Sequence, residues 1–383
     1  MIGVIADDLT GAAELGAVGL RHGLRAEIVR SGQPSGKADL VCVDTDSRSC
    51  NPAEAGKRAA AAARLLHQSG AEWIYKKVDS VLRGQVTAEV EAVMEQLQLH
   101  RALLLPANPS LGRVIRNGQY FVRGKPIHKT EFARDPEYPR RAPQVMRLLK
   151  LPEKFSIRLS NGNRSLSDDT IVVGNAATSA DVREWAACRE ADMLPAGGSE
   201  FFGALLAAIP VLVPANGEIV PDAAPGRELF VCGTSTESAR KFVAVARRRK
   251  TPVFSLPREL IWGADFSVAA QEAVTQRVLA AFETGPRVIL NVGLPPVRNP
   301  VVARPLSDCV VKIAERVLRQ LSIPNVFAEG GATAAELVRR MGWARLMVLR
   351  ELAPGVARLA VDGAQSVLLT IKPGTYAWPA KWT

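Results

Sequence analysis

The chain has 383 residues, a length that predicts two domains, and 47% of them are apolar, as in ordinary globular proteins. The five cysteines are widely spaced without a CxxC pair and the four histidines are scattered, which argues against a disulfide scaffold and a zinc site. The first residues lack a signal-peptide pattern and no apolar run reaches membrane-spanning length, so we expect a cytoplasmic protein with no membrane partner.

The formal net charge is +11, from 49 basic and 38 acidic residues. Such an excess is typical of nucleic-acid binding and also of enzymes that attract anionic substrates. The densest basic run, residues 247–250, ends a predicted helix, where cations complement the helix dipole. No basic stretch alternates with aromatic residues as single-strand binding requires. We therefore expect a small anionic partner and no nucleic acid.

Short apolar runs alternate with longer helical patterns in the first half. They predict strands at residues 2–5, 40–43, 73–75, 102–105 and 171–173, and helices at 11–22, 52–68, 85–98 and 179–190. This alternation predicts a mostly parallel sheet with helices on both faces. Residues 106–142 differ, because they are rich in Pro, Gly, Arg and Asn; such a stretch is usually functional or disordered.

A linker is predicted at residues 213–226, because four prolines and two glycines lie between residues 210 and 226. The domains are then 1–212 and 227–383. In the second domain the pattern predicts strands at 229–232, 253–255, 288–291 and 325–328, helices at 237–249, 268–283, 306–321 and 334–341, and antiparallel C-terminal strands at 345–350, 356–360 and 366–370. The predicted fold class is α/β, with two domains that are each a mostly parallel sheet flanked by helices.

Two adjacent acids, Asp7 and Asp8, follow the first predicted strand, with Thr10 and Gly11 behind them. Ligands of open α/β sheets bind at the carboxyl ends of strands. Carboxylates there can accept hydrogen bonds from sugar hydroxyls or take a proton from one. Helix capping is the alternative, since Asp and Thr are natural N-caps, but two acids exceed what one cap needs.

Two further motifs are expected at the same sheet edge. Residues 75–85 follow a strand and contain bases that suit a carboxylate or phosphate, although a solvated basic turn is the alternative. Residues 44–48 follow another strand and are a weaker signal, since Asp and Ser are common in turns. The candidate residues in these motifs are Lys76, Lys77, Asp79, Ser80, Arg83, Asp46 and Arg48.

Two strand–loop–helix turns in the second half are rich in Gly, Ser and Thr, and backbone amides of such turns bind phosphates. Their residues are Gly233, Thr234, Ser235 and Thr236 in one turn, and Gly330, Gly331, Ala332 and Thr333 in the other. Gly11 and Gly16 have Walker spacing, but Ala17 and Val18 replace the required Lys-Ser/Thr. No GxGxxG follows a strand, which disfavours a dinucleotide oxidoreductase.

In this order, the motifs resemble those of the four-carbon acid sugar kinase family, over nearly the whole chain. The matching segments are residues 6–12, 44–48, 76–84, 117–120, 135–136, 233–236, 330–333 and 372–374. The resemblance implies an acid-sugar-binding N-terminal domain, a nucleotide-binding C-terminal domain and an active site in the cleft between them. It also implies phosphorylation of a hydroxyl of threonate, erythronate or an oxo-tetronate with ATP and Mg²⁺.

The resemblance also implies residue roles. Asp8, and Asp7 second, would orient the hydroxyl or act as the base, and Arg83 with Lys76 and Lys77 would hold the carboxylate. Thr10, Asp46, Arg48, Asp79, Ser80 and Asp135 join the substrate-binding residues. Lys372 and Gly374 join the two Gly/Thr turns as nucleotide-binding residues. A homodimer is kept as an option.

Some positions depart from the family pattern. Ala332 stands where many relatives carry Asp after the paired glycines, so Glu329 becomes a candidate to hold Mg²⁺, whose ligands are otherwise unassigned. Val81 and Gln85 replace Thr and Asn. Ala332 keeps open the alternative of a non-catalytic sensor of ATP and acid, and the charge keeps open a nucleic-acid-binding protein.

Overall fold

The computed structural model describes residues 1–135, 137–160, 170–209, 226–257, 267–293, 300–363, 367–374 and 376–382. Contacts divide the chain into two compact units, Met1–Asn216 and Gly217–Thr383, which are described separately. Of the predicted linker 213–226, only Gly226 lies within the described residues. Among the residues described, no helix combines the length and apolar character needed to cross a membrane.

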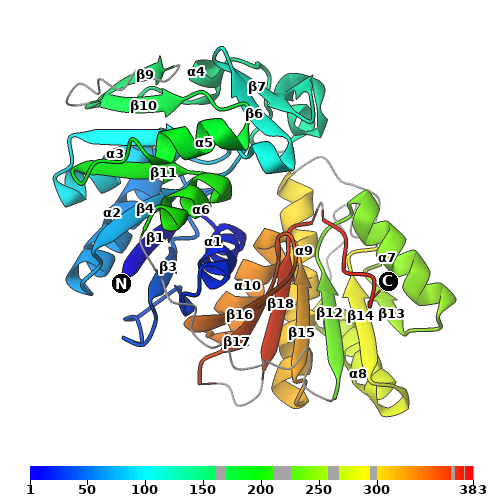
Figure 1. The fold of residues 1–383 in the computed structure, drawn as a ribbon. Helices are drawn as coiled ribbons and strands as arrows, with labels where there is room; N and C mark the ends of the chain where they lie inside the picture. The colour runs from blue at the N-terminus through cyan, green and yellow to red at the C-terminus, as the bar shows by residue number, and fades with distance from the viewer. Residues whose placement is uncertain are drawn as a thin grey trace. The chain divides into compact units, whose positions relative to one another are not determined.

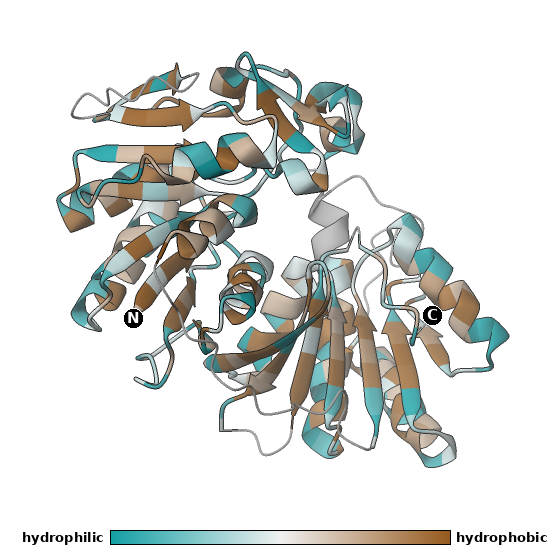
Figure 2. Cartoon of the chain, viewed as in Figure 1, coloured by the Kyte–Doolittle hydropathy of each residue, from teal (hydrophilic) through white to brown (hydrophobic). Residues whose placement is uncertain are grey.

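The first unit is built on a parallel sheet whose strand order is β2-β3-β1-β4-β11-β5-β10-β9 (Figure 1). Its strands are β1 (Ile2–Ala6), β2 (Ala26–Val29), β3 (Leu40–Asp44), β4 (Trp73–Lys77), β5 (Arg101–Leu105), β9 (Ser156–Ser160), β10 (Thr170–Gly174) and β11 (Met193–Gly197). Most central strands are buried along their whole length, which explains their continuous apolar runs (Figure 2). Because β1 pairs with β3 and β4, the residues after these three strands meet at one edge.

Helices cover both faces of this sheet, as expected for parallel strands joined by crossovers. They are α1 (Leu9–Arg21), α2 (Pro52–Gln68), α3 (Val86–Leu97), α4 (Val145–Leu148), α5 (Ser179–Ala186) and α6 (Ser199–Ala207). Helix α2 packs on α3, and α6 packs on both α1 and α5. Pro52 at the first turn of α2 and the Asn51 cap, which accepts from the Glu54 amide, explain where that helix begins.

The irregular stretch at 106–142 is an ordered excursion from the main sheet. It contains a small antiparallel sheet and three 3₁₀ turns: β6 (Arg113–Arg116), β7 (Gln119–Val122), β8 (Lys125–Pro126), η1 (Pro109–Leu111), η2 (Ile127–Lys129) and η3 (Glu131–Arg134). Tyr120 at its centre is fully buried and its hydroxyl donates to the Ser80 carbonyl. The excursion therefore packs onto the loop after β4.

The second unit has strand order β13-β14-β12-β15-β18-β17-β16, in which β16 and β17 are antiparallel to their neighbours. Its elements are β12 (Glu228–Cys232), α7 (Glu237–Arg248), β13 (Val253–Ser255), α8 (Val268–Thr284), β14 (Arg287–Asn291), α9 (Pro300–Gln320), β15 (Asn325–Glu329), α10 (Gly331–Met341), β16 (Arg345–Ala353), β17 (Val356–Val361) and β18 (Leu368–Lys372). Helix α9 packs between α8 and α10, while Phe242 of α7 lies in a cluster of buried aromatic residues.

That aromatic core consists of Phe230, Phe242, Phe327, Trp378 and Trp382. Phe230 and Phe327 stack with ring centroids 4.1 Å apart, and both tryptophans meet these rings edge-on. Aromatic pairs of this kind stabilise a core beyond their buried area. The segment after β18 is thus part of the core of the second unit.

The predicted fold class is confirmed in each unit, and the C-terminal strands are antiparallel as expected, except that β18 also pairs in parallel with β15. Five elements of the first sheet and its helix layers were not predicted: β2, β9, β11, α4 and α6. Strand β4 also continues two residues further than predicted, through Lys76 and Lys77. Both lysines are therefore strand residues rather than loop residues.

Candidate active site

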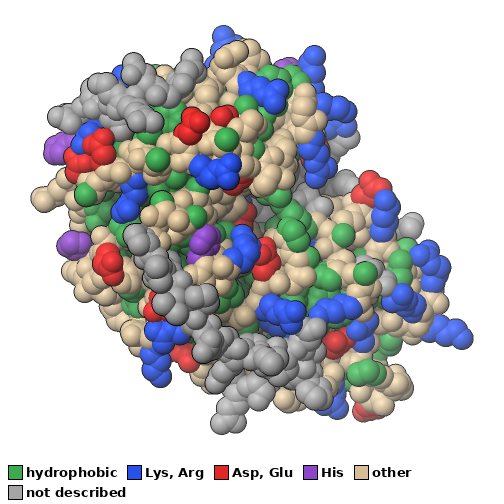
Figure 3. Space-filling model, viewed as in Figure 1, with side chains coloured by type: hydrophobic (Ala, Val, Ile, Leu, Met, Phe, Trp, Pro, Cys, Tyr) green, Lys and Arg blue, Asp and Glu red, His purple; other side chains and the backbone are tan. Residues whose placement is uncertain are grey.

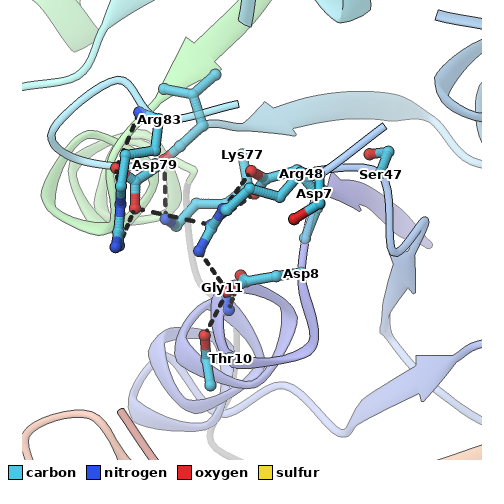
Figure 4. Close-up of polar contacts among 12 residues, drawn as sticks. Asp7, Asp8, Thr10, Gly11, Ser47, Arg48, Lys77, Asp79 and Arg83 are labelled. Atoms are coloured by element: carbon cyan, nitrogen blue, oxygen red, sulfur yellow. Dashed lines mark hydrogen bonds and ion pairs between the residues drawn. The ribbon is translucent and has the colours of Figure 1, made fainter. Parts of the chain in front are cut away.

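The two acids after β1 have different surroundings (Figure 4). Asp8 is the N-cap of α1, and its Oδ1 accepts from the Gly11 amide at 2.8 Å. Its Oδ2 accepts from the Thr10 hydroxyl at 2.6 Å. The Asp8 side chain remains 16% exposed, whereas that of Asp7 is 3% exposed. Asp8 thus caps the helix and also keeps a partly exposed carboxylate.

Arg48 joins the two acids. Its Nε and Nη2 bind both oxygens of Asp7 at 2.7 and 2.9 Å, and its Nη1 binds Asp8 Oδ2 at 2.6 Å. Backbone amides of Ser47 and Arg48 also donate to the Asp7 carbonyl, which seats the loop after β3 on the loop after β1. Burial raises the pKa of Asp7, but the Arg48 guanidinium outweighs it and holds that pKa below its usual value. Asp7 is therefore ionised and committed to Arg48.

Arg83 lies in a second ion pair beside the first. Its Nε and Nη2 bind Asp79 at 3.1 and 2.8 Å, and its Nη1 lies 3.3 Å from Asp135 Oδ2. Asp79 also lies 3.7 Å from the Arg48 guanidinium. Although burial opposes ionisation, Arg83 and Arg48 lower the pKa of Asp79 well below its usual value. The structure thus brings together Asp7, Asp8, Arg48, Asp79, Arg83 and Asp135.

Lys76 and Lys77 do not offer free charges to a ligand. Lys76 is fully buried and pairs with Glu89 Oε2 at 2.8 Å. Lys77 points to the other face of β4 and pairs with Glu14 Oε2 at 3.3 Å. Both lysines were expected to bind the substrate carboxylate. This role is not supported for Lys76, because Glu89 neutralises its charge beneath the surface.

Asp46 and Ser80 are also engaged. Asp46, with a φ of 47°, directs its half-exposed carboxylate to Arg30, at 3.1 Å. It does not join the cluster around Arg48, so its predicted place beside the substrate is not supported. Ser80 is buried, and its hydroxyl accepts from the Arg113 guanidinium. Ser80 thus anchors the excursion rather than presenting a free hydroxyl.

Two arginines of the excursion were missed at the level of sequence. Arg140 is 6% exposed, and its Nε and Nη1 donate to the carbonyls of Tyr138 and Leu82 at 2.7 and 3.0 Å. Among the described residues neither Arg140 nor Arg113 forms an ion pair, and Arg140 Nη2 has no acceptor. Burial lowers the pKa of Arg140, and Asp79 and Asp135 oppose that shift. The Arg-rich composition of 106–142 was the available signal.

The first Gly/Thr turn of the second unit follows β12. Thr236 caps α7, since its hydroxyl accepts from the Ala239 amide, and it donates to the Gly374 carbonyl at 2.7 Å. Thr234 lies against Gly374. This turn and the turn after β18 are therefore in contact.

The second Gly/Thr turn follows β15. Gly330 has a φ of 101° and offers no side chain to cap α10, whose first turn contains Gly331, the exposed Ala332 and the buried Thr333. Amides of a first helical turn lack intrahelical acceptors and favour anions. The Thr333 hydroxyl lies so close to Gly233 that a Cβ on Gly233 would be 2.0 Å from it. The two turns thus lie side by side and can cradle phosphates.

Beside these turns, a pocket of about 330 Å³ extends along α7. Its lining residues include Thr234, Ser235, Arg240, Asn291 and Gly293. Ser235 thus faces a hollow next to the proposed phosphate cradle. A hollow of this size at the carboxyl ends of parallel strands is typical of a small-molecule site.

Lys372 and Glu329 are buried partners. Lys372 Nζ lies 3.1 Å from Glu329 Oε2, and Trp378 Nε1 donates to the same oxygen at 2.8 Å. Both side chains are fully buried. Burial raises the pKa of Glu329 and lowers that of Lys372. Lys372 is therefore placed beneath the turn rather than toward phosphates, which corrects the expectation of direct nucleotide contact.

Lys372 and Trp378 both bind Oε2 of Glu329, while Oε1 is buried with no partner among the described residues. Because the whole side chain is buried, it does not reach the surface of the turn where a hydrated magnesium ion would bind, so Glu329 is not assigned as a magnesium ligand. Among the described residues no group of three or more His, Cys, Asp or Glu could hold a metal ion. Mg²⁺ commonly keeps several waters and binds through phosphates plus one or two carboxylates.

Comparison with protein families decides the classification. The model of a sugar-binding N-terminal domain matches residues 2–205, and that of a nucleotide-binding C-terminal domain matches residues 229–376. The chain belongs to the four-carbon acid sugar kinase family. The acidic cluster thus lies in the family's sugar-binding domain and the Gly/Thr turns in its nucleotide-binding domain.

Relatives within the family are similar to different extents. A D-threonate kinase of Cupriavidus necator is 30% identical over 386 residues, covering 92% of this chain and 88% of its own. A D-threonate kinase of Salmonella typhimurium is 35% identical over 158 residues, which cover only 40% of this chain and 37% of that protein. Other relatives are named 3-oxo-tetronate kinase and D-erythronate kinase. A solved Salmonella typhimurium structure, 19% identical, shares the fold with a TM-score of 0.80 over 100% of this chain and 97% of its own.

Proposed function

We propose that this protein transfers the γ-phosphoryl group of ATP to a hydroxyl of a four-carbon sugar acid. The observation that carries the proposal is the pair Asp7 and Asp8, held by Arg48 at the strand ends of the sugar-binding unit. Family membership supports the reaction class, and the names of the relatives support threonate, erythronate or 3-oxo-tetronate as acceptor.

Asp8 is the proposed base. The acceptor hydroxyl donates a hydrogen bond to its exposed carboxylate, and the proton passes to Asp8 as the hydroxyl oxygen bonds to the γ-phosphorus and the bond to the β–γ bridging oxygen breaks. Asp7 is less suited because its side chain is only 3% exposed, against 16% for Asp8, and both of its oxygens bind the Arg48 guanidinium. Arg48 would keep Asp7 ionised and fix the orientation of both acids.

The substrate carboxylate needs a cation that is not already neutralised. Arg83 is shared between Asp79 and Asp135, and Lys76 is buried with Glu89. Arg140, with Arg113 beside Ser80, is the better candidate, because it is buried, bordered by the Asp79–Arg83–Asp135 cluster and has no carboxylate partner among the described residues. Charge-assisted hydrogen bonds to a carboxylate are about twice as strong as neutral ones. Arg83 would then orient Asp79 and Asp135 around the acid.

The phosphates of ATP are assigned to the amides at the start of α10 and to the turn at residues 233–236, with Gly374 closing one side. Mg²⁺, bound together with the nucleotide at these turns, would supply positive charge that neutralises the charge developing during transfer. Fixed amides and Mg²⁺ suit phosphoryl transfer, which depends mainly on positioning and electrostatic stabilisation.

The test is formation of ADP from ATP and Mg²⁺ with a panel of D- and L-threonate, D- and L-erythronate and 3-oxo-tetronate. We expect turnover with at least one acid and none with uncharged polyols. A folded protein that turns over none of the acids rules out the proposal. ADP binding without turnover would instead favour the sensor alternative, which the exposed Ala332 at the start of α10 keeps open.

A further inference from the structure

The ends of three neighbouring strands carry polar residues inside the aromatic core of the second unit. Cys232, Glu329 and Lys372 are directly paired in register across β12, β15 and β18. All three are fully buried, and Trp378 covers them, with Lys372 Nζ 5.1 Å from its ring centroid. A charged row in such a place is costly unless every group finds partners.

Each of the three ammonium donors of Lys372 has its own acceptor. One faces Glu329 Oε2 at 3.1 Å, and the others reach the carbonyls of Pro373 at 3.2 Å and Tyr376 at 2.7 Å. An ammonium group has three donors, so none is left for a ligand. Pro373 and Tyr376 flank Gly374, which belongs to the proposed nucleotide site.

The opposite side of the same turn is held by α7. The Thr236 hydroxyl donates to the Gly374 carbonyl at 2.7 Å, and the Ser238 hydroxyl donates to the Tyr376 carbonyl at 2.8 Å. The Tyr376 carbonyl thus accepts from Lys372 below and from Ser238 beside it. The position of Gly374 against Thr234 depends on both sets of bonds.

We propose that Lys372 is a positioning residue of the nucleotide site: it holds the turn around Gly374 against the Thr234–Thr236 loop without touching the nucleotide. The inference rests on the proposed function, in which Gly374 and this loop border the phosphates. A buried ion pair is weak evidence for stability, because apolar residues of similar volume often replace it without loss. An apolar side chain, however, cannot donate to the Pro373 and Tyr376 carbonyls.

The test separates positioning from stability with two variants, Lys372→Met and the double variant Lys372→Met/Glu329→Gln. The single variant leaves Glu329 charged and buried, so its thermal stability should fall. The double variant removes that charge, while the new side-chain amide oxygen still accepts from Trp378, so stability should recover. Because neither variant restores the bonds to the turn, the affinity for Mg²⁺-ADP, measured by calorimetry, should fall about tenfold or more in both. The KM for ATP should rise more than the KM for the acid.

The matched control is Lys241→Met, which changes an exposed lysine on α7 and should leave ADP affinity unchanged. Recovery of ADP affinity together with stability in the double variant would overturn the positioning role, and so would wild-type affinity in the single variant. If both variants bind ADP as well as the wild-type protein does, only the positioning role is ruled out. If the wild-type protein binds no ADP, the proposed nucleotide site itself is ruled out.

Discussion

Asp8 and Asp7 are adjacent in the chain, yet substitution disturbs the surroundings of Asp8 less than those of Asp7. Asp8 caps α1, and Asn caps helices about as well as Asp. Asp7 instead holds the Arg48 guanidinium with both oxygens. Substitution by Asn at Asp8 therefore keeps the cap and removes one ion pair with Arg48, whereas at Asp7 it removes the two-oxygen contact with the same guanidinium.

Asp8→Asn should lower kcat by about 10²- to 10⁴-fold, because the hydroxyl loses the group that takes its proton. The KM for ATP should stay near that of wild type, and the unfolding temperature should fall less than in Asp7→Asn, since Arg48 keeps its two bonds to Asp7. Steady-state kinetics and thermal unfolding check both. A kcat within a few-fold of wild type would assign the base elsewhere, and Asp7→Asn, which should lose stability, is the companion measurement.

Arg140→Met should raise the KM for the acid about tenfold or more, because a charge-assisted hydrogen bond to the carboxylate is lost. The neighbouring, exposed Arg141→Met is the control and should behave as wild type. Kinetics with the acid and with its uncharged amide give the sharper readout. Wild type should prefer the acid and Arg140→Met should not; an unchanged preference would place the carboxylate at another cation.

Asp44 predicts a pH effect on stability. Burial raises its pKa to about 6, although Arg30 Nε lies 2.7 Å away and opposes the shift. Since the folded pKa exceeds the unfolded one, the folded state binds the extra proton below pH 6, and its stabilising contribution is lost as the pH rises through 6. The full shift corresponds to about 3 kcal/mol, of which about 2 kcal/mol falls between pH 4 and pH 7.

Asp44→Asn should remove this decline. Urea unfolding of both proteins from pH 4 to pH 7 measures it, with the difference between the two free-energy profiles as the result, since other groups titrate in both. Parallel profiles would show that Asp44 is ionised throughout. The opposite dependence is expected from Asp79, whose lowered pKa makes its stabilising contribution disappear on acidification.

At the scale of elements, the distance between two turns limits side-chain size. Gly233 ends β12 where Thr333 of α10 and Ser307 of α9 converge; a Cβ there would lie 2.0 and 2.7 Å from their hydroxyl oxygens. Gly285, between α8 and β14, has open space around its Cβ position and extended backbone. The two glycines therefore make a matched pair.

Gly233→Ala should cost about 1–3 kcal/mol of stability through overpacking and should weaken ADP binding, because the two turns must separate. Gly285→Ala should be near neutral in both. Chemical unfolding and calorimetric titration with ADP measure the two effects. Equal stability of the two variants would mean that Thr333 and Ser307 move aside without cost.

The elements that sequence patterns predict well are the buried parallel strands, since runs such as Ile2–Ala6 are apolar throughout. Strand β11 was missed because Pro195 and a terminal glycine read as a loop, and β2 because Glu27 interrupts it. Glu27 is nevertheless buried, and its carboxylate accepts from the amide and hydroxyl of Ser35. A partner eight residues away is not visible in the pattern of β2 itself.

Across the whole molecule, polar motifs at strand ends predicted which side chains gather at one sheet edge, but not how their charges pair. The acids after β1 could have met Lys76, Lys77, Arg48 or Arg83, and the structure pairs them with Arg48, 40 and 41 residues away. Such pairing depends on how loops fold over the sheet edge. Arg140 escaped prediction for the same reason, because its neighbours at Leu82 and Asp79 come from a distant loop.

Many of the basic side chains that give the molecule its positive net charge have acidic partners close by. Basic and acidic side chains are interspersed on the face drawn in Figure 3. Several basic side chains pair within their own helices, as Arg339 and Arg340 do with Glu336 in α10. Exposed pairs of this kind contribute little to stability, so their main effect is to reduce the local excess of positive charge.

The aromatic core of the second unit has a consequence for biosynthesis. Trp378 and Trp382 follow every strand of that unit in the chain, yet they complete the core formed by Phe230 and Phe327. During translation, domains generally fold from the N-terminus onward. The sugar-binding unit can therefore fold while the ribosome is still making the rest. The nucleotide-binding unit must wait until both tryptophans have emerged, so a nascent chain acquires its two binding capacities in a fixed order.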